Sequence, residues 1–86
     1  LDFFENNFSD YFTISPNPTT DIINLGVLDE NRILINAIYI YDMGGNLVGY
    51  YFGTTRTMDL NHLFAGNYFM KLTTDKGEFT TQFIKL

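Results

Sequence analysis

Cysteine and tryptophan are both absent from this sequence, and basic residues are scarce, with five lysines and arginines against ten acidic residues. Without cysteine no disulfide framework can form, so a hydrophobic core has to hold the fold on its own. The formal charge of −5 argues against nucleic acid and anionic membranes as partners, because clustered lysine and arginine bind phosphate groups. We therefore expect no nucleic-acid partner.

Long hydrophobic runs are absent as well. No apolar stretch approaches the roughly 20 residues that a membrane-spanning helix needs, so we expect no membrane span. Residues 1–20 also lack the basic start and apolar centre of a secretory signal peptide. If the parent protein is exported, we expect its signal peptide to lie upstream of Leu1.

Residues that carry catalytic or metal chemistry are few and isolated. His62 is the single histidine, and no second histidine or cysteine supports it as a metal ligand. Asp29 and Glu30 lack the spaced oxygen ligands of a calcium loop, and Ser9 and Ser15 lie in no nucleophile elbow. Paired carboxylates require geometry to assess, but a small domain has little room for a deep cleft. We predict no catalytic residue, no metal, no cofactor and no enzymatic activity.

The sequence does contain a regular series of β-strand patterns. Its 86 residues fit one small domain, and its nine phenylalanines and six tyrosines are typical of β-rich proteins. Residues 61–64, about one turn, are the one helical candidate inside the domain. Seven strands with turn signals between them predict an all-β fold, a seven-stranded antiparallel immunoglobulin-like β-sandwich. The predicted strands are residues 12–14, 22–27, 33–41, 47–52, 56–60, 66–73 and 79–86.

The period of two along these strands selects the side chains that form the core. One of Phe83 and Ile84 should also face inward. The other expected core residues are Ile23, Leu25, Ile38, Ile40, Tyr68, Met70 and Leu72.

We divide the chain into a linker at residues 1–11 and a domain at residues 12–86. Phe4 and Phe8 fall near helical spacing with Tyr11, so a short amphipathic turn is the alternative to a linker that packs a phenylalanine on the domain.

Three turn motifs separate the strands. The first motif, SPNPTTD at residues 15–21, holds Pro16 and Pro18, which fix φ and bias the preceding residues toward extended backbone. Asn17 is thereby constrained, and the side chain of Asp21 can bond neighbouring amides. The motif predicts a rigid loop between two strands.

The second motif is YDMGGNLV at residues 41–48. Asp42 can accept hydrogen bonds from turn amides, and Gly45 can adopt positive φ. A hairpin connection is predicted, because neither the helix nor the lysine of a phosphate-binding loop follows.

The third motif is MDLNHLFAGNYFMKL at residues 58–72. Gly66 permits a tight corner before a strand, and Tyr68 then places its ring in the core. A buried tyrosine hydroxyl needs a partner, for which Asp59 and Asn61 are the candidates.

Together the three motifs resemble the type A C-terminal sorting domain of the type IX (Por) secretion system. The resemblance covers residues 12–86 in the family's order, and Phe83-Ile84-Lys85 resembles the family's basic terminal strand. The sorting-motif residues that the resemblance marks are Pro16, Asn17, Pro18, Asp21, Asp42, Gly45, Gly66, Tyr68, Lys71 and Lys85.

The resemblance implies an address label for export in a Gram-negative bacterium. An upstream cargo domain would pass through the periplasm and reach the cell surface or the medium. The implied partners are the outer-membrane translocon and shuttle proteins of the type IX system, and a sortase-like processing protease. That protease would cut near residues 1–11 and join the cargo to an anionic lipopolysaccharide. We also expect the last strand to offer an exposed edge to a partner strand, with the charge of Lys85 beside it.

An immunoglobulin-like carbohydrate-binding or adhesion module is the main alternative, and a structural spacer is a third. Five aromatic residues could form a sugar-stacking platform, and a coplanar exposed row of three rings would favour it. Scattered rings would favour the sorting signal. The five residues are Phe3, Phe4, Tyr39, Tyr50 and Tyr51.

Overall fold

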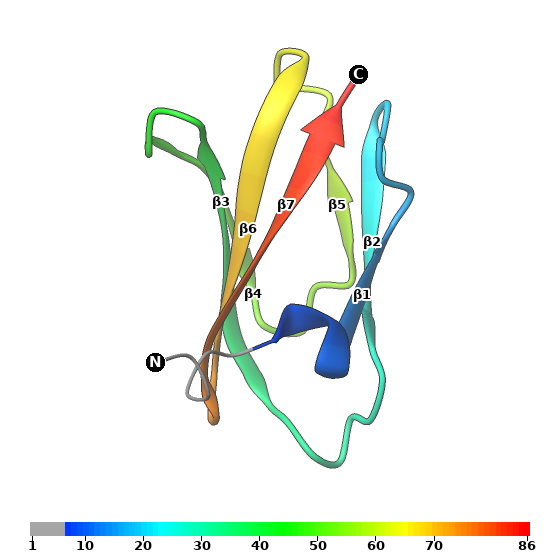
Figure 1. Cartoon of the computed structure of the whole chain (residues 1–86), viewed down its shortest axis with the longest axis vertical. Coiled ribbons are helices and arrows are strands. Elements are labelled where there is room, and N and C mark those ends of the chain that lie inside the picture. The colour runs from blue at the N-terminus through cyan, green and yellow to red at the C-terminus, as the bar shows by residue number, and fades with distance from the viewer. Residues whose placement is uncertain (1–6) are drawn as a thin grey trace.

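The computed structural model describes residues 7–86 and shows two antiparallel β-sheets that face each other (Figure 1). The strands of one sheet follow the order β1-β2-β5, and those of the other follow β4-β3-β6-β7. The predicted all-β sandwich of seven antiparallel strands is confirmed. The strands are β1 (Phe12–Ser15), β2 (Ile22–Val27), β3 (Ile35–Asp42), β4 (Leu47–Phe52), β5 (Thr57–Asp59), β6 (Gly66–Thr74) and β7 (Gly77–Lys85).

All seven strand boundaries agree with the predicted ones to within two residues. The helical turn is in a different place. Residues 61–64 form a turn and not a helix, whereas Phe8–Asp10 forms a short 3-10 helix, η2. Within the described part of the chain, no helix is long and apolar enough to cross a membrane.

The core lies between the two sheets and contains every side chain that the period of two selected. Phe83 faces inward and is 1% exposed, whereas Ile84 is 42% exposed. Phe8 of η2 joins this core and packs against Phe12, with the ring centroids 5.2 Å apart. Residues 8–10 therefore pack on the sandwich, at the end opposite to the C-terminus (Figure 1).

A β-bulge shifts the register of β3 against β6 between Ile35 and Ala37, at the point where Asn36 interrupts the apolar pattern. The backbone of Gly53 lies against this bulge. A Cβ atom at Gly53 would be 2.0 Å from the carbonyl oxygen of Ile35, which is backbone and cannot rotate away. This close approach requires glycine.

We predict that Gly53→Ala destabilises the domain by about 1–3 kcal/mol, because the added methyl group overlaps the bulge. Thermal denaturation should show the melting temperature falling by several degrees for each kcal/mol lost. Gly44→Ala is the control, since its Cβ would meet only side-chain atoms at 3.2 and 3.4 Å. Equal melting temperatures for the two variants would contradict the prediction.

Candidate recognition surface at one end of the sandwich

The three motifs, which are far apart in the sequence, meet at one end of the sandwich. Asp42 of the second motif lies opposite Tyr68 of the third in the β3–β6 ladder. Gly66 lies opposite Lys85, and Lys85 forms a parallel bridge with Thr19 of the first motif. The C-terminus is at this end, and η2 is at the other (Figure 1). We call the residues of the three motifs at this end, together with Lys85, the motif end.

The first motif lies along the outer edge of β7. The side chain of Asn17 accepts a hydrogen bond from the backbone N–H of Ile84 at 3.0 Å. Its amide nitrogen donates to the carbonyl of Gln82 at 3.4 Å. Asn17 thus substitutes for a neighbouring strand, and Pro16 and Pro18 on either side of it are exposed.

Thr19 extends this contact as a single strand-like residue. Its N–H donates to the carbonyl of Ile84 at 2.9 Å, and its carbonyl accepts from the N–H of Leu86 at 2.8 Å. Its hydroxyl donates to the carbonyl of Ile22, and the residue is 1% exposed. The expectation that the last strand offers an exposed edge was therefore wrong for residues 82–86, because the first motif already occupies that edge.

Lys85 also differs from the expected picture. The residue is 9% exposed, and its ammonium group donates to the carbonyl of Leu86 at 3.0 Å. The ammonium group of Lys85 is thus bonded to the chain's own backbone on a largely buried residue. Removing Lys85 and Leu86 would also break the bridge to Thr19, so their loss would disturb the packing at this end.

Asp42 organises the second motif as a turn. One carboxylate oxygen accepts from the N–H groups of Gly44 and Asn46, both at 2.9 Å, and the other accepts from the side-chain amide of Asn46 at 3.1 Å. Gly45 adopts φ of 84°, as predicted. The hydrogen bonds from Asn46 lower the pKa of Asp42 most, and the amides of Gly44 and Gly45 lower it further. The carboxylate is therefore ionised at neutral pH.

Tyr68 fixes the loop of the third motif. Its ring is buried, and its hydroxyl donates to the carbonyl of Phe64 at 2.6 Å. The expected partners of this hydroxyl, Asp59 and Asn61, instead bond to each other, with the N–H of Asn61 donating to Asp59 at 2.9 Å. Gly66 has φ of 156° at the start of β6.

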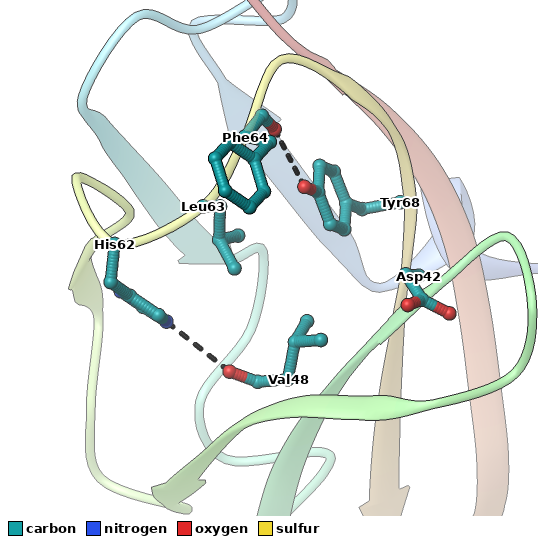
Figure 2. A pocket seen from close by; sticks show the side chains of 6 residues that line it. All are labelled: Asp42, Val48, His62, Leu63, Phe64 and Tyr68. Atoms are coloured by element: carbon teal, nitrogen blue, oxygen red, sulfur yellow. Dashed lines mark hydrogen bonds between the residues drawn. The ribbon is translucent and has the colours of Figure 1, made fainter.

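A cleft of about 400 Å³ opens between the second and third motifs. Figure 2 shows the six side chains around it. His62 lies within hydrogen-bonding distance of the carbonyl of Val48, at 3.2 Å. Sequence reasoning placed Asp42 and Tyr68 in motifs but did not find this cleft, because it depends on which loops meet in space. The remaining lining residues are Val48, His62, Leu63 and Phe64.

Lys71 is the one predicted sorting-motif residue that lies away from the motif end. It is opposite Tyr39 in the β3–β6 ladder, on the outer face of the four-stranded sheet. Its ammonium nitrogen lies 5.1 Å from the ring centroid of Tyr39 and 5.4 Å from that of Tyr41. These are cation–π distances, so the rings themselves already bind this cation.

The outer-face aromatic rings do not form the coplanar row that a sugar platform would need. Tyr39 and Tyr41 are stacked at 21°, but Tyr50 is tilted by 60° against Tyr39. Tyr51 packs against the core, and burial raises the pKa of its hydroxyl, with a smaller contribution from Asp59. Phe3 and Phe4 lie outside the described residues. By this criterion the arrangement favours the sorting signal over the carbohydrate-binding module.

The comparison with protein families decides between these classes. The family model of the secretion system C-terminal sorting domain matches residues 13–86. The chain belongs to this family. The sorting domain is thus a type IX secretion signal, which implies interaction with the type IX machinery and export of the attached protein to the cell surface or the medium. No match was found among curated proteins.

The sorting-domain family is not known for catalysis, and the described residues fit a recognition role. Among residues 7–86, no group of three histidine, cysteine or acidic side chains is placed to hold a metal ion. The motif end consists of a strand edge covered by the first motif, a turn held by the Asp42 carboxylate, and a cleft between the second and third motifs.

We predict that Asn17→Ala loosens the end of β7. Losing a net hydrogen bond should cost about 1 kcal/mol, and hydrogen exchange of the Ile84 amide should accelerate about fivefold for each kcal/mol. Asn67→Ala is the matched control, because Asn67 lies opposite Ile84 on β6 with an exposed side chain. Unchanged exchange at Ile84 in the Asn17 variant would show that the side-chain contact is not maintained in solution.

The pKa of Asp42 predicts a pH dependence. Because folding lowers this pKa, the ionised carboxylate stabilises the native state at neutral pH, and this contribution is lost as the pH falls below about 4. The difference in melting temperature between the wild type and Asp42→Asn should therefore be largest near pH 7 and should shrink in acid. A difference that stays constant from neutral to acidic pH would contradict the role of ionisation.

Proposed function

We propose that the folded sandwich presents its motif end to the outer-membrane translocon and to the shuttle proteins of the type IX system. The cargo precedes the domain in the chain and is attached before η2, at the end opposite to the motif end. The fusion of cargo and domain crosses the periplasm of a Gram-negative bacterium. Residues 1–11 act as the linker and residues 12–86 as the signal. A sortase-like protease cuts in the linker and joins the cargo to an anionic lipopolysaccharide.

The observation that carries the proposal is the meeting of three sequence-distant motifs at one end, opposite to η2 (Figure 1). A single hydrophobic core could form without bringing these three motifs to the same end. Pro16, Pro18 and Asp21 are exposed there, so packing does not explain their presence. Cargo attached before η2 would leave this end free for a partner.

The position of η2, at the end opposite to the motif end (Figure 1), supports recognition and processing on the same domain. A protease that cuts near η2 would approach the end of the sandwich that a translocon bound at the motif end leaves free. The two partners could therefore bind one domain without competing for the same surface.

A fusion experiment tests the role of the motif end. A reporter with an export signal is joined to residues 1–86 and expressed in cells with and without the type IX translocon. The reporter should reach the surface only when the translocon is present. Asp21→Ala should lower the surface fraction severalfold, because it removes an exposed charge at the motif end.

Lys76→Ala is the matched control. It removes one exposed charge in the β6–β7 hairpin, at the other end of the sandwich, and should leave delivery unchanged. Melting curves of both variants should match the wild type, since surface substitutions are usually close to neutral. Equal surface delivery of the reporter by the two variants would exclude the motif end as the surface that the type IX machinery recognises.

Processing is tested on the same fusion by mass spectrometry of the two products. A released domain that begins within residues 1–11, together with a reporter of increased mass, is the expected result. Surface reporter that still carries the whole domain would refute cleavage while leaving recognition intact.

A further inference from the structure

The cleft between the second and third motifs has an apolar floor and a polar rim. Val48, Leu63 and the ring of Tyr68 are half-buried or buried and form the floor. Asp42 and the exposed Phe64 lie at the rim, together with His62 (Figure 2). The volume of about 400 Å³ is sufficient for one long side chain.

Hydrogen bonds hold the walls of this cleft in place. The Asp42 carboxylate accepts three hydrogen bonds from its own turn, and the Tyr68 hydroxyl holds the backbone of Phe64. The Phe64 side chain is 89% exposed, so the core does not need it. An aromatic ring has only two χ angles to order on binding and buries a large apolar area, which makes it suitable as an interface anchor.

The charge of the lining indicates the occupant. One carboxylate and no lysine or arginine line the cleft, in a chain of formal charge −5. An aliphatic stem can pack on Val48 and Leu63 while its cationic head reaches Asp42. A planar guanidinium can bond the carboxylate through two parallel N–H groups and stack flat on an aromatic ring, whereas a lysine ammonium acts as a point charge in both contacts.

We propose that the cleft receives a single arginine side chain from a protein of the secretion machinery, with its stem on Val48 and Leu63 and its guanidinium between Asp42 and Phe64. This proposal rests on the proposed function, since it names the chemistry that the partner brings to the motif end. It assigns Phe64, which lies outside the predicted sorting-motif residues, as a contact residue.

A competition experiment tests the contact. Free domain, residues 1–86, is expressed in excess in the periplasm of cells that export the reporter fusion. Wild-type domain should reduce surface delivery by occupying the partner. Phe64→Ala and Asp42→Asn should each need roughly tenfold more domain for the same reduction. Phe52→Ala is the matched control, because Phe52 is 75% exposed but lies at the far end of β4.

Which variants compete less strongly identifies the side chain that occupies the cleft. Loss with Phe64→Ala but not with Asp42→Asn would indicate an uncharged apolar side chain and overturn the arginine assignment. Competition by Phe64→Ala at wild-type strength would overturn the cleft as a site. A wild-type domain that neither delivers the reporter nor competes would instead overturn the proposed function.

Photo-crosslinking provides a readout that does not depend on the stability of Asp42→Asn. A photoreactive amino acid at position 64 should form an adduct with a protein of the outer membrane, whereas the same amino acid at position 52 should not. The adducted peptide should contain an arginine, and changing that arginine to glutamine should remove the adduct. An adduct to a peptide without arginine would overturn the proposal.

Discussion

The hydrogen bonds of Thr19 join the two sheets at the motif end, and the arrangement of that end depends on them. Thr19 follows β1 of the three-stranded sheet and bonds to Ile84 in β7 of the other sheet and to Leu86 directly after it. Its hydroxyl also bonds to the carbonyl of Ile22. A substitution at this buried position would remove the hydroxyl and leave the carbonyl of Ile22 without this donor, which is costly because the site is shielded from water. The first motif therefore has a structural role, because it closes the sandwich at this end.

This closure also protects an edge strand. The outer edge of β7 would otherwise present unpaired backbone groups, which invite pairing with other chains. Asn17 and Thr19 occupy those groups over residues 82–86. A partner that reads the motif end consequently meets side chains and a rigid loop there, and backbone pairing at that part of β7 would first require the first motif to leave.

The fold was largely predictable from the sequence, and the site only in part. Period-two patterns placed Tyr68 and Met70 inside because one face of a strand has to be buried. Turn chemistry correctly gave Asp42 its amide partners, since those contacts are local. The partner of the Tyr68 hydroxyl was predicted wrongly, because the geometry of the loop brings the Phe64 carbonyl closer than Asp59. The exposure of Lys85 was likewise misjudged, because its burial depends on how the sheets close, which no local pattern encodes.

The long sequence separation between Asn17 and Ile84, 67 positions, has a consequence for the timing of folding. Contacts between residues so far apart form only after most of the intervening chain is in place, and such topologies fold slowly. A nascent or truncated domain that lacks the last strand cannot assemble the surface that its first motif helps to build. The surface at the motif end can therefore form only after the whole domain, including β7, has been synthesised and folded.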